Sequence, residues 1–92
     1  MTVWMILEWA GDGYLTRHLC GSKEIAKKHL LKYIKDAYLH HYFESEDEEE
    51  EKEYNKYVDI ITNWKTEKSL VSQKDYINVW NYQACEMTIE ED

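Results

Sequence analysis

The chain has 92 residues, which suffices for one domain with a single modest core. A hydrophobic fraction of 43% argues against a wholly disordered acidic chain, and no apolar run approaches the roughly 20 residues that a membrane span needs. The net charge of −8 disfavours sequence-independent binding to a phosphate backbone, so we expect no direct contact with nucleic acid.

The cysteines and the first residues bear on the cellular compartment. Val3–Trp9 is too short for a secretion signal and lacks its basic leader and small-residue cleavage site. We therefore expect a cytoplasmic protein, with no membrane attachment and with Cys20 and Cys85 reduced. A Cys20–Cys85 disulfide remains an alternative if strands pair the two residues.

The first predicted elements form an antiparallel hairpin. Val3–Trp9 is β-branched and aromatic, which is typical of a buried strand. The run 11–13 (Gly-Asp-Gly) supplies turn chemistry, because glycine adopts positive φ without a Cβ clash. Tyr14–Cys20 then alternates as a second strand.

Two amphipathic helices are predicted next. Ser22 is a candidate N-cap for a helix from Lys23 to about Phe43. Its apolar positions recur every three or four residues, at Ile25 or Ala26, Leu30, Tyr33 or Ile34, Ala37 and His41. A second helix opens inside an acidic run, because carboxylates favour the positive end of the helix dipole. Its buried stripe is expected at Tyr54, Tyr57, Val58, Ile61 and Trp64, with Val71 as a further candidate.

A third strand is predicted at Tyr76–Tyr82, with an extension to Ile89 left open. Alternation separates its aromatic residues from its aliphatic ones: Tyr76, Trp80 and Tyr82 against Ile77 and Val79. If the aliphatic residues meet the helices, the aromatic row points outward. In the competing arrangement, the aromatic residues are buried under the helices and the aliphatic ones are exposed.

The order ββααβ predicts an α+β fold, with a three-stranded antiparallel sheet and two helices packed on one face. A short extra strand at Ser69–Ser72 is an alternative connection. Residues 1–92 are expected to form a single compact domain, with the acidic segment 44–53 between the helices and a short acidic tail at Glu90–Asp92.

Charge is distributed unevenly. Residues 1–43 hold six basic and four acidic side chains, a net of +2, whereas residues 44–92 hold five and fifteen, a net of −10. Eight carboxylates fall within ten residues: Glu44, Glu46, Asp47, Glu48, Glu49, Glu50, Glu51 and Glu53. This run is either a solubilising segment or a docking surface for a basic protein, including mimicry of a nucleic-acid backbone. Hard-cation binding is disfavoured, because EF-hand loops alternate their acids around a glycine.

No catalytic or cofactor motif is present. His40 and His41 point about 100° apart on a helix and His29 is about three turns away, so we expect no metal site there. His18 and Cys20 share one strand face, but nothing in the sequence supplies an orienting carboxylate or an oxyanion hole. We expect neither an enzyme nor a cofactor.

In size, absence of proline, acidic segment and surface-prone aromatics on one compact α+β domain, the chain resembles small phage-encoded inhibitors of bacterial defence, such as anti-CRISPR and anti-restriction proteins. The resemblance implies an inhibitor that occupies the nucleic-acid or recognition cleft of its target without catalysis. Its partner would be a basic, nucleic-acid-handling enzyme in the host cytoplasm.

The expected partner-binding residues are the eight carboxylates together with Trp80 and Tyr82, since Tyr and Trp are enriched at interface hot spots. The alternative is a structural or regulatory interaction module, a homodimer included, that uses exposed aromatics of the sheet.

Overall fold

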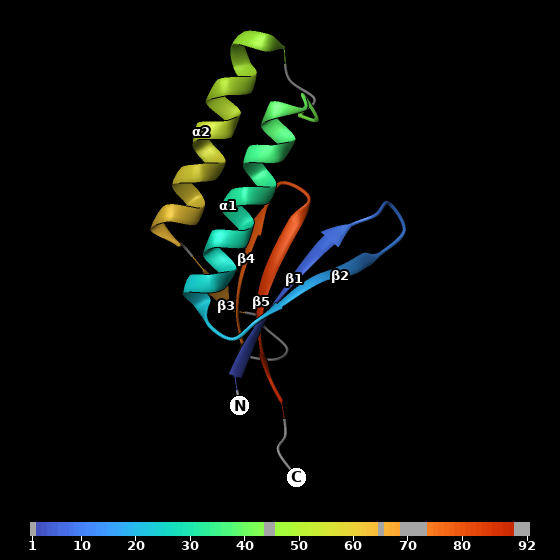
Figure 1. The fold of residues 1–92 in the computed structure, drawn as a ribbon, viewed down its shortest axis with the longest axis vertical. Helices are drawn as coiled ribbons and strands as arrows, with labels where there is room; N and C mark the ends of the chain where they lie inside the picture. The colour runs from blue at the N-terminus through green and yellow to red at the C-terminus, as the bar shows by residue number, and fades with distance from the viewer. Residues whose placement is uncertain (1, 44–45, 65, 69–73, 90–92) are drawn as a thin grey trace.

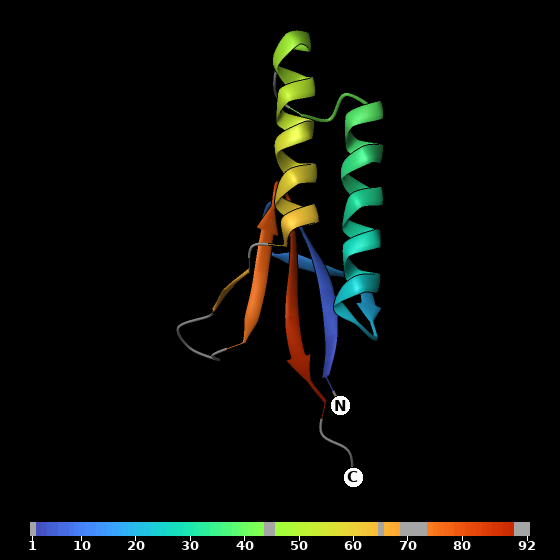
Figure 2. The same ribbon diagram turned by 90° about the vertical axis from the view of Figure 1, so that its left-hand side faces the viewer.

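The fold is α+β, as the sequence predicts: two helices lie on one face of an antiparallel sheet (Figure 1, Figure 2). The computed structural model describes residues 2–43, 46–64, 66–68 and 74–89. The elements are β1 (Thr2–Trp9), β2 (Tyr14–Cys20), α1 (Lys23–Leu39), α2 (Asp47–Asn63), β3 (Glu67–Lys68), β4 (Asp75–Val79) and β5 (Tyr82–Thr88). Within these ranges, no helix combines the length and the apolar character needed to cross a bilayer.

The sheet has five strands in the order β2-β1-β5-β4-β3. The first and last strands of the chain are neighbours in its interior, with Thr2 opposite Thr88 and Glu8 opposite Tyr82. Every pairing is antiparallel. The complete sheet therefore forms only when the first and last strands pair.

The predicted three-stranded sheet and its ββααβ order are wrong, because the expected third strand is a hairpin. β4 ends at Val79, which pairs with Tyr82 across the turn formed by Trp80 and Asn81. The backbone of Trp80 has a φ of 53°, in the left-handed region. No glycine marks this turn, so the aromatic and aliphatic alternation continues through it without a visible break.

Some expectations fall outside the described residues. These are the strand considered at Ser69–Ser72, the stripe position Val71 and the acidic tail Glu90–Asp92. Among the described residues, the edge of the sheet beside β4 is formed by the two-residue strand β3, in which Glu67 is opposite Tyr76.

The core lies between the helices and one sheet face. Ile6 pairs with His18 on one side and Ala84 on the other, and Ala84 pairs with Ile77. The side chains of Ile6, Ala84 and Ile77 are 0%, 0% and 2% exposed. The helices place their own buried stripe on this row, with Ala26, Leu30, Ile34, Ala37 and Ile61. Above Trp4, the ring of Trp64 packs edge-on at 5.4 Å.

The start of α1 is as predicted, but its end is not. Ser22 Oγ accepts a hydrogen bond from the Ile25 amide at 3.2 Å, which confirms the N-cap. The helix ends at Leu39 rather than near Phe43 in a Schellman arrangement, in which the Tyr42 amide donates to the Ala37 carbonyl and the His41 amide to the Tyr38 carbonyl. His41 adopts the left-handed conformation, with φ of 56°, that glycine usually supplies.

The two cysteines do not form a disulfide. Cys20 pairs with Trp4 on the helix-covered face, whereas Cys85 pairs with Met5 on the opposite face, with β1 between them. Because neighbouring strands lie about 4.8 Å apart, two residues separated by a strand exceed the ~7 Å Cα limit for a disulfide. Both thiols are free.

Substitution on the two faces of the sheet should have unequal effects. We expect Ile6→Ala to lower the free energy of unfolding by about 2–5 kcal/mol, because it opens a cavity in the core. Leu19→Ala, at a position 57% exposed on the other face, should change it by about 0.5 kcal/mol or less. Urea unfolding of the two variants measures both values, and equal losses would contradict the assignment of faces.

Candidate functional site

The helices extend beyond the sheet and form a protruding end (Figure 1). This end is built from the last turn of α1, the first turns of α2 and the residues that join them. We call it the helical tip and define it by its exposed side chains: Leu39, His40, Tyr42, Glu46, Glu48, Glu49 and Glu51.

The acidic run opens α2, as the sequence predicts, but its members do not act alike. Glu46 is the N-cap residue, and Glu48, Glu49 and Glu51 are exposed on the first turns. Negative charge is favourable here, because the first amides of a helix carry the positive end of its dipole. Glu44 and the side chain of Asp47 lie outside the described part of the chain.

Glu50 is directed inward. It is 4% exposed, and its Oε2 lies 2.9 Å from His41 Nδ1. Position 50 precedes Tyr54, Tyr57 and Ile61 by four, seven and eleven residues, so it continues the buried stripe of α2. The sequence held this signal, because the stripe can be extended backward into the run. Glu50 therefore holds the connection between the helices and is not available to a partner.

Glu53 is also engaged within the fold. The Tyr57 hydroxyl donates a hydrogen bond to Glu53 Oε1 at 2.6 Å. Burial, and then this bond to a carboxylate, raise the pKa of Tyr57 above its usual range. Among the described side chains of the run, the exposed charge is thus concentrated at Glu46, Glu48, Glu49 and Glu51.

Trp80 and Tyr82 do not form the outward aromatic row that the sequence allowed as one of two arrangements. Ile77 and Val79 do face the helices, but the turn at Trp80 restarts the alternation, so Tyr82 shares the helix-covered face with Ala84. Trp80 is half-buried and packs edge-on against Phe43 at 5.1 Å. Its placement is that of a packing residue.

Tyr82 joins the sheet to α1. Its ring stacks on Tyr33 at 5.1 Å, and its hydroxyl donates to Glu8 Oε1 at 3.2 Å. Burial, followed by the charge and hydrogen bond of Glu8, raises the pKa of Tyr82 to about 12. Arg17 forms an ion pair with the same Glu8 carboxylate. Tyr82 is therefore committed to contacts inside the molecule.

The sheet face opposite the helices carries an apolar row. Met5 pairs with Leu19 on one side and Cys85 on the other, and Cys85 pairs with Tyr76, which sets one row of this face. Its exposed apolar side chains define what we call the open sheet face: Trp9, Tyr14, Leu19 and Met87. Trp9 and Tyr14 pack edge-on at 5.2 Å and supply the aromatic surface predicted for other residues.

Two exposed residues of the helical tip were not predicted from the sequence. Leu39 and Tyr42 are 58% and 63% exposed, the highest values among the large hydrophobic side chains of the described residues. Leu39 falls outside the three-to-four-residue repeat of α1, which is the signal that marks it as unburied. Tyr42 gave no signal, because the predicted helix continued through it.

The adjacent histidines have separate partners, although they follow the end of α1 and do not lie on a helix as expected. His40 Nδ1 lies 2.7 Å from the Asp36 carbonyl oxygen, and its ring stacks on Tyr42 at 5.6 Å. His41 lies against Glu50. His29 is elsewhere, with its ring centroid 3.9 Å from that of His18. Burial, aided by the positive charges of His18 and Lys32, lowers the pKa of His29.

His18 and Cys20 share the helix-covered face of β2, as predicted. Cys20 is 2% exposed, and burial raises the pKa of its thiol. A protonated, buried thiol is a weak nucleophile. Burial therefore acts against formation of the thiolate at Cys20.

No protein-family model, curated protein or solved structure matches the chain.

Trp80→Ala should lower the free energy of unfolding by about 2 kcal/mol, because it removes a half-buried ring from its contact with Phe43. The matched control is Trp9→Ala, at a strand residue 45% exposed on the open sheet face, where we expect a loss below about 1 kcal/mol. Urea unfolding monitored by circular dichroism gives both values. Unchanged stability in the Trp80 variant would contradict its role in packing.

Proposed function

We propose that this protein is a non-enzymatic inhibitor whose helical tip occupies a basic, nucleic-acid-binding groove on a host nucleic-acid-handling protein. The observation that supports this most is the grouping of four exposed carboxylates with exposed Leu39 and Tyr42 on the protruding end of the molecule. Such a target, in the cytoplasm of a cell that defends itself against foreign DNA, agrees with the resemblance to anti-defence inhibitors.

The charge density of the tip supports mimicry of a nucleic-acid backbone. At 1.5 Å of helix rise per residue, Glu46 to Glu51 spans about 7.5 Å of axis. Its four exposed carboxylates correspond to about one charge per 2.5 Å, against one per about 1.7 Å along duplex DNA. A groove that attracts phosphates would attract this helix end for the same electrostatic reason.

The apolar residues of the helical tip, Leu39 and Tyr42, can supply binding affinity that exposed charge alone does not. Exposed charges steer encounter and set specificity, whereas buried aromatic anchors provide most of the affinity at an interface. Tyr42 is suited to that role, since its ring is stacked on His40 and lies next to the His41–Glu50 contact. A ring already held in place loses less conformational entropy on binding.

Reversal of the tip charge should abolish capture of the partner. The variant E48K/E49K/E51K omits the buried Glu50, so the fold should remain intact, since exposed charges contribute little to stability. We expect wild type, immobilised at about 0.05 M salt, to capture a nucleic-acid-handling protein from bacterial lysate. Duplex DNA should release the captured protein, because it competes for the same groove. Salt of about 0.5 M should also release it, because the Debye length falls to a few ångströms.

The matched control changes net charge equally at other exposed acids, with D12K, E24K and D59K combined. It should retain capture, while the tip variant loses it. Equal loss in both variants would mean that net charge alone matters, and retention in the tip variant would leave the acidic residues as a solubilising segment. Circular dichroism verifies that each variant is folded.

A second candidate is supported by the open sheet face. Leu19, Tyr14 and Trp9 are 57%, 51% and 45% exposed on the side of the sheet that carries no described helix. Exposed apolar surface commonly marks an interaction site. The corresponding function is a protein-interaction module that pairs with a second copy of itself through this face.

Two leucines of matched exposure distinguish the surfaces. If the open sheet face forms a homodimer, Leu19→Glu should convert a dimer to a monomer in sedimentation equilibrium, because a buried unpaired charge is costly at an interface. Leu39→Glu, at a position 58% exposed on the helical tip against 57% for Leu19, should leave the dimer intact. If the wild-type protein stays monomeric when its concentration in the sedimentation experiment is raised about 100-fold, this candidate is excluded.

A further inference from the structure

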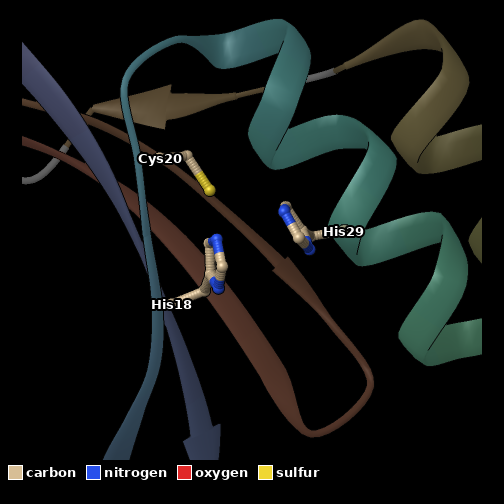
Figure 3. A group of neighbouring side chains, drawn as sticks. All are labelled: His18, Cys20 and His29. Atoms are coloured by element: carbon tan, nitrogen blue, oxygen red, sulfur yellow. The ribbon is translucent and has the colours of Figure 1, made fainter.

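Three potential metal ligands converge where β2 meets α1 (Figure 3). The ligand atoms of His18, Cys20 and His29 all lie within 4.8 Å of one another. Cys20 is buried, and the two imidazoles are half-buried. Two of these residues come from a strand and the third from a helix, so the group exists only in the folded chain.

The local fold explains the convergence. His18 and Cys20 are two residues apart on β2, so both side chains point toward the helices. The chain then turns through Gly21 into α1, whose N-cap is Ser22. His29 lies three residues after Ala26 and four before Tyr33, on the side of α1 that meets the sheet.

The separations are close to what a metal ion requires. Zinc bonds of about 2.3 Å to sulfur and 2.0–2.1 Å to nitrogen place tetrahedral ligands about 3.3–3.6 Å apart. The observed limit of 4.8 Å exceeds this range, so binding requires the side chains to rotate and bring their ligand atoms closer together. The two rings are tilted by 34° with their centroids 3.9 Å apart, so they must also separate around the ion.

The donor set selects the class of ion. A thiolate with two imidazoles suits zinc and its neighbours, whereas magnesium and calcium prefer oxygen ligands. Among the described residues, no carboxylate joins this group. Lys32 acts on His29 as a nearby positive charge and opposes a cation. We therefore expect an affinity below that of all-thiolate structural zinc sites.

We propose that His18, Cys20 and His29 bind one zinc-class divalent ion, with water in the fourth position. Binding releases the thiol proton of Cys20 to solvent, because the thiolate is the ligand. The ion would fix β2, an edge strand, to the first turns of α1. This site lies at the opposite end of α1 from the helical tip, so it does not depend on the proposed function (Figure 1).

Cobalt supplies a direct readout. The purified chain, kept reduced with a phosphine and freed of metal by chelation, is titrated with Co²⁺ and then with Zn²⁺. We expect a thiolate-to-cobalt charge-transfer band and the intense d–d bands of four-coordinate cobalt, both saturating at one equivalent. Zinc should remove both bands and raise the melting temperature, since an ion that binds only the folded state stabilises it.

Variants assign the ligands. Cys20→Ser should lose the charge-transfer band, and His18→Gln or His29→Gln should weaken cobalt binding by at least about tenfold. Cys85→Ser and His40→Gln, which change the same residue types outside the group, should bind as wild type does. Circular dichroism of the metal-free variants shows which are folded. If Cys20→Ser does not fold, cobalt binding by His18→Gln and His29→Gln tests the site, because these two residues are only half-buried.

Three results would overturn the proposal. One is the absence of a saturable band in the folded wild type. Another is loss of the charge-transfer band in Cys85→Ser instead of Cys20→Ser. The third is saturation at one equivalent that neither histidine variant weakens, which would show that these imidazoles are not ligands.

Discussion

The pairing of β1 with β5 is the constraint on which the other features depend. It joins the two ends of the chain in the interior of the sheet, with Ile6 opposite Ala84. Because side chains alternate along a strand, a slip of one residue would turn Ile6 out of the core. The correct register therefore fixes which face the helices cover, which face remains open, and on which side His18 and Cys20 project.

The lengths of the elements then produce the helical tip. Each helix has 17 residues, or about 25 Å at 1.5 Å per residue, and extends past the strands it covers (Figure 1). Beyond the sheet the helices pack against each other, as in the stack of Tyr38 on Tyr54 at 4.5 Å. The exposed glutamates at this end are thus displayed on a packed pair of helices.

Aromatic residues connect the sheet, the helices and their connection into one packed unit. Ring contacts run without interruption through the interior, along Tyr57, Phe43, Trp80, Tyr82, Tyr33, His29 and His18. A small core fills its volume efficiently with large rings. Most of the aromatic content therefore serves packing, and the exposed remainder is divided between Tyr42 at the tip and the Trp9–Tyr14 pair on the open face.

Local patterns in the sequence determined the fold class, the first hairpin, the Ser22 cap, the stripe of α2 and the start of that helix in the acidic run, since each depends on residues a few positions apart. They could not reveal the turn at Trp80 or the end of α1 at Leu39, because residues without the usual glycine adopt left-handed backbone there. Nor could they bring His29 to Cys20, which lie on different elements. Those placements are decided by long-range packing, which sets the direction of each side chain only when strand and helix are assembled.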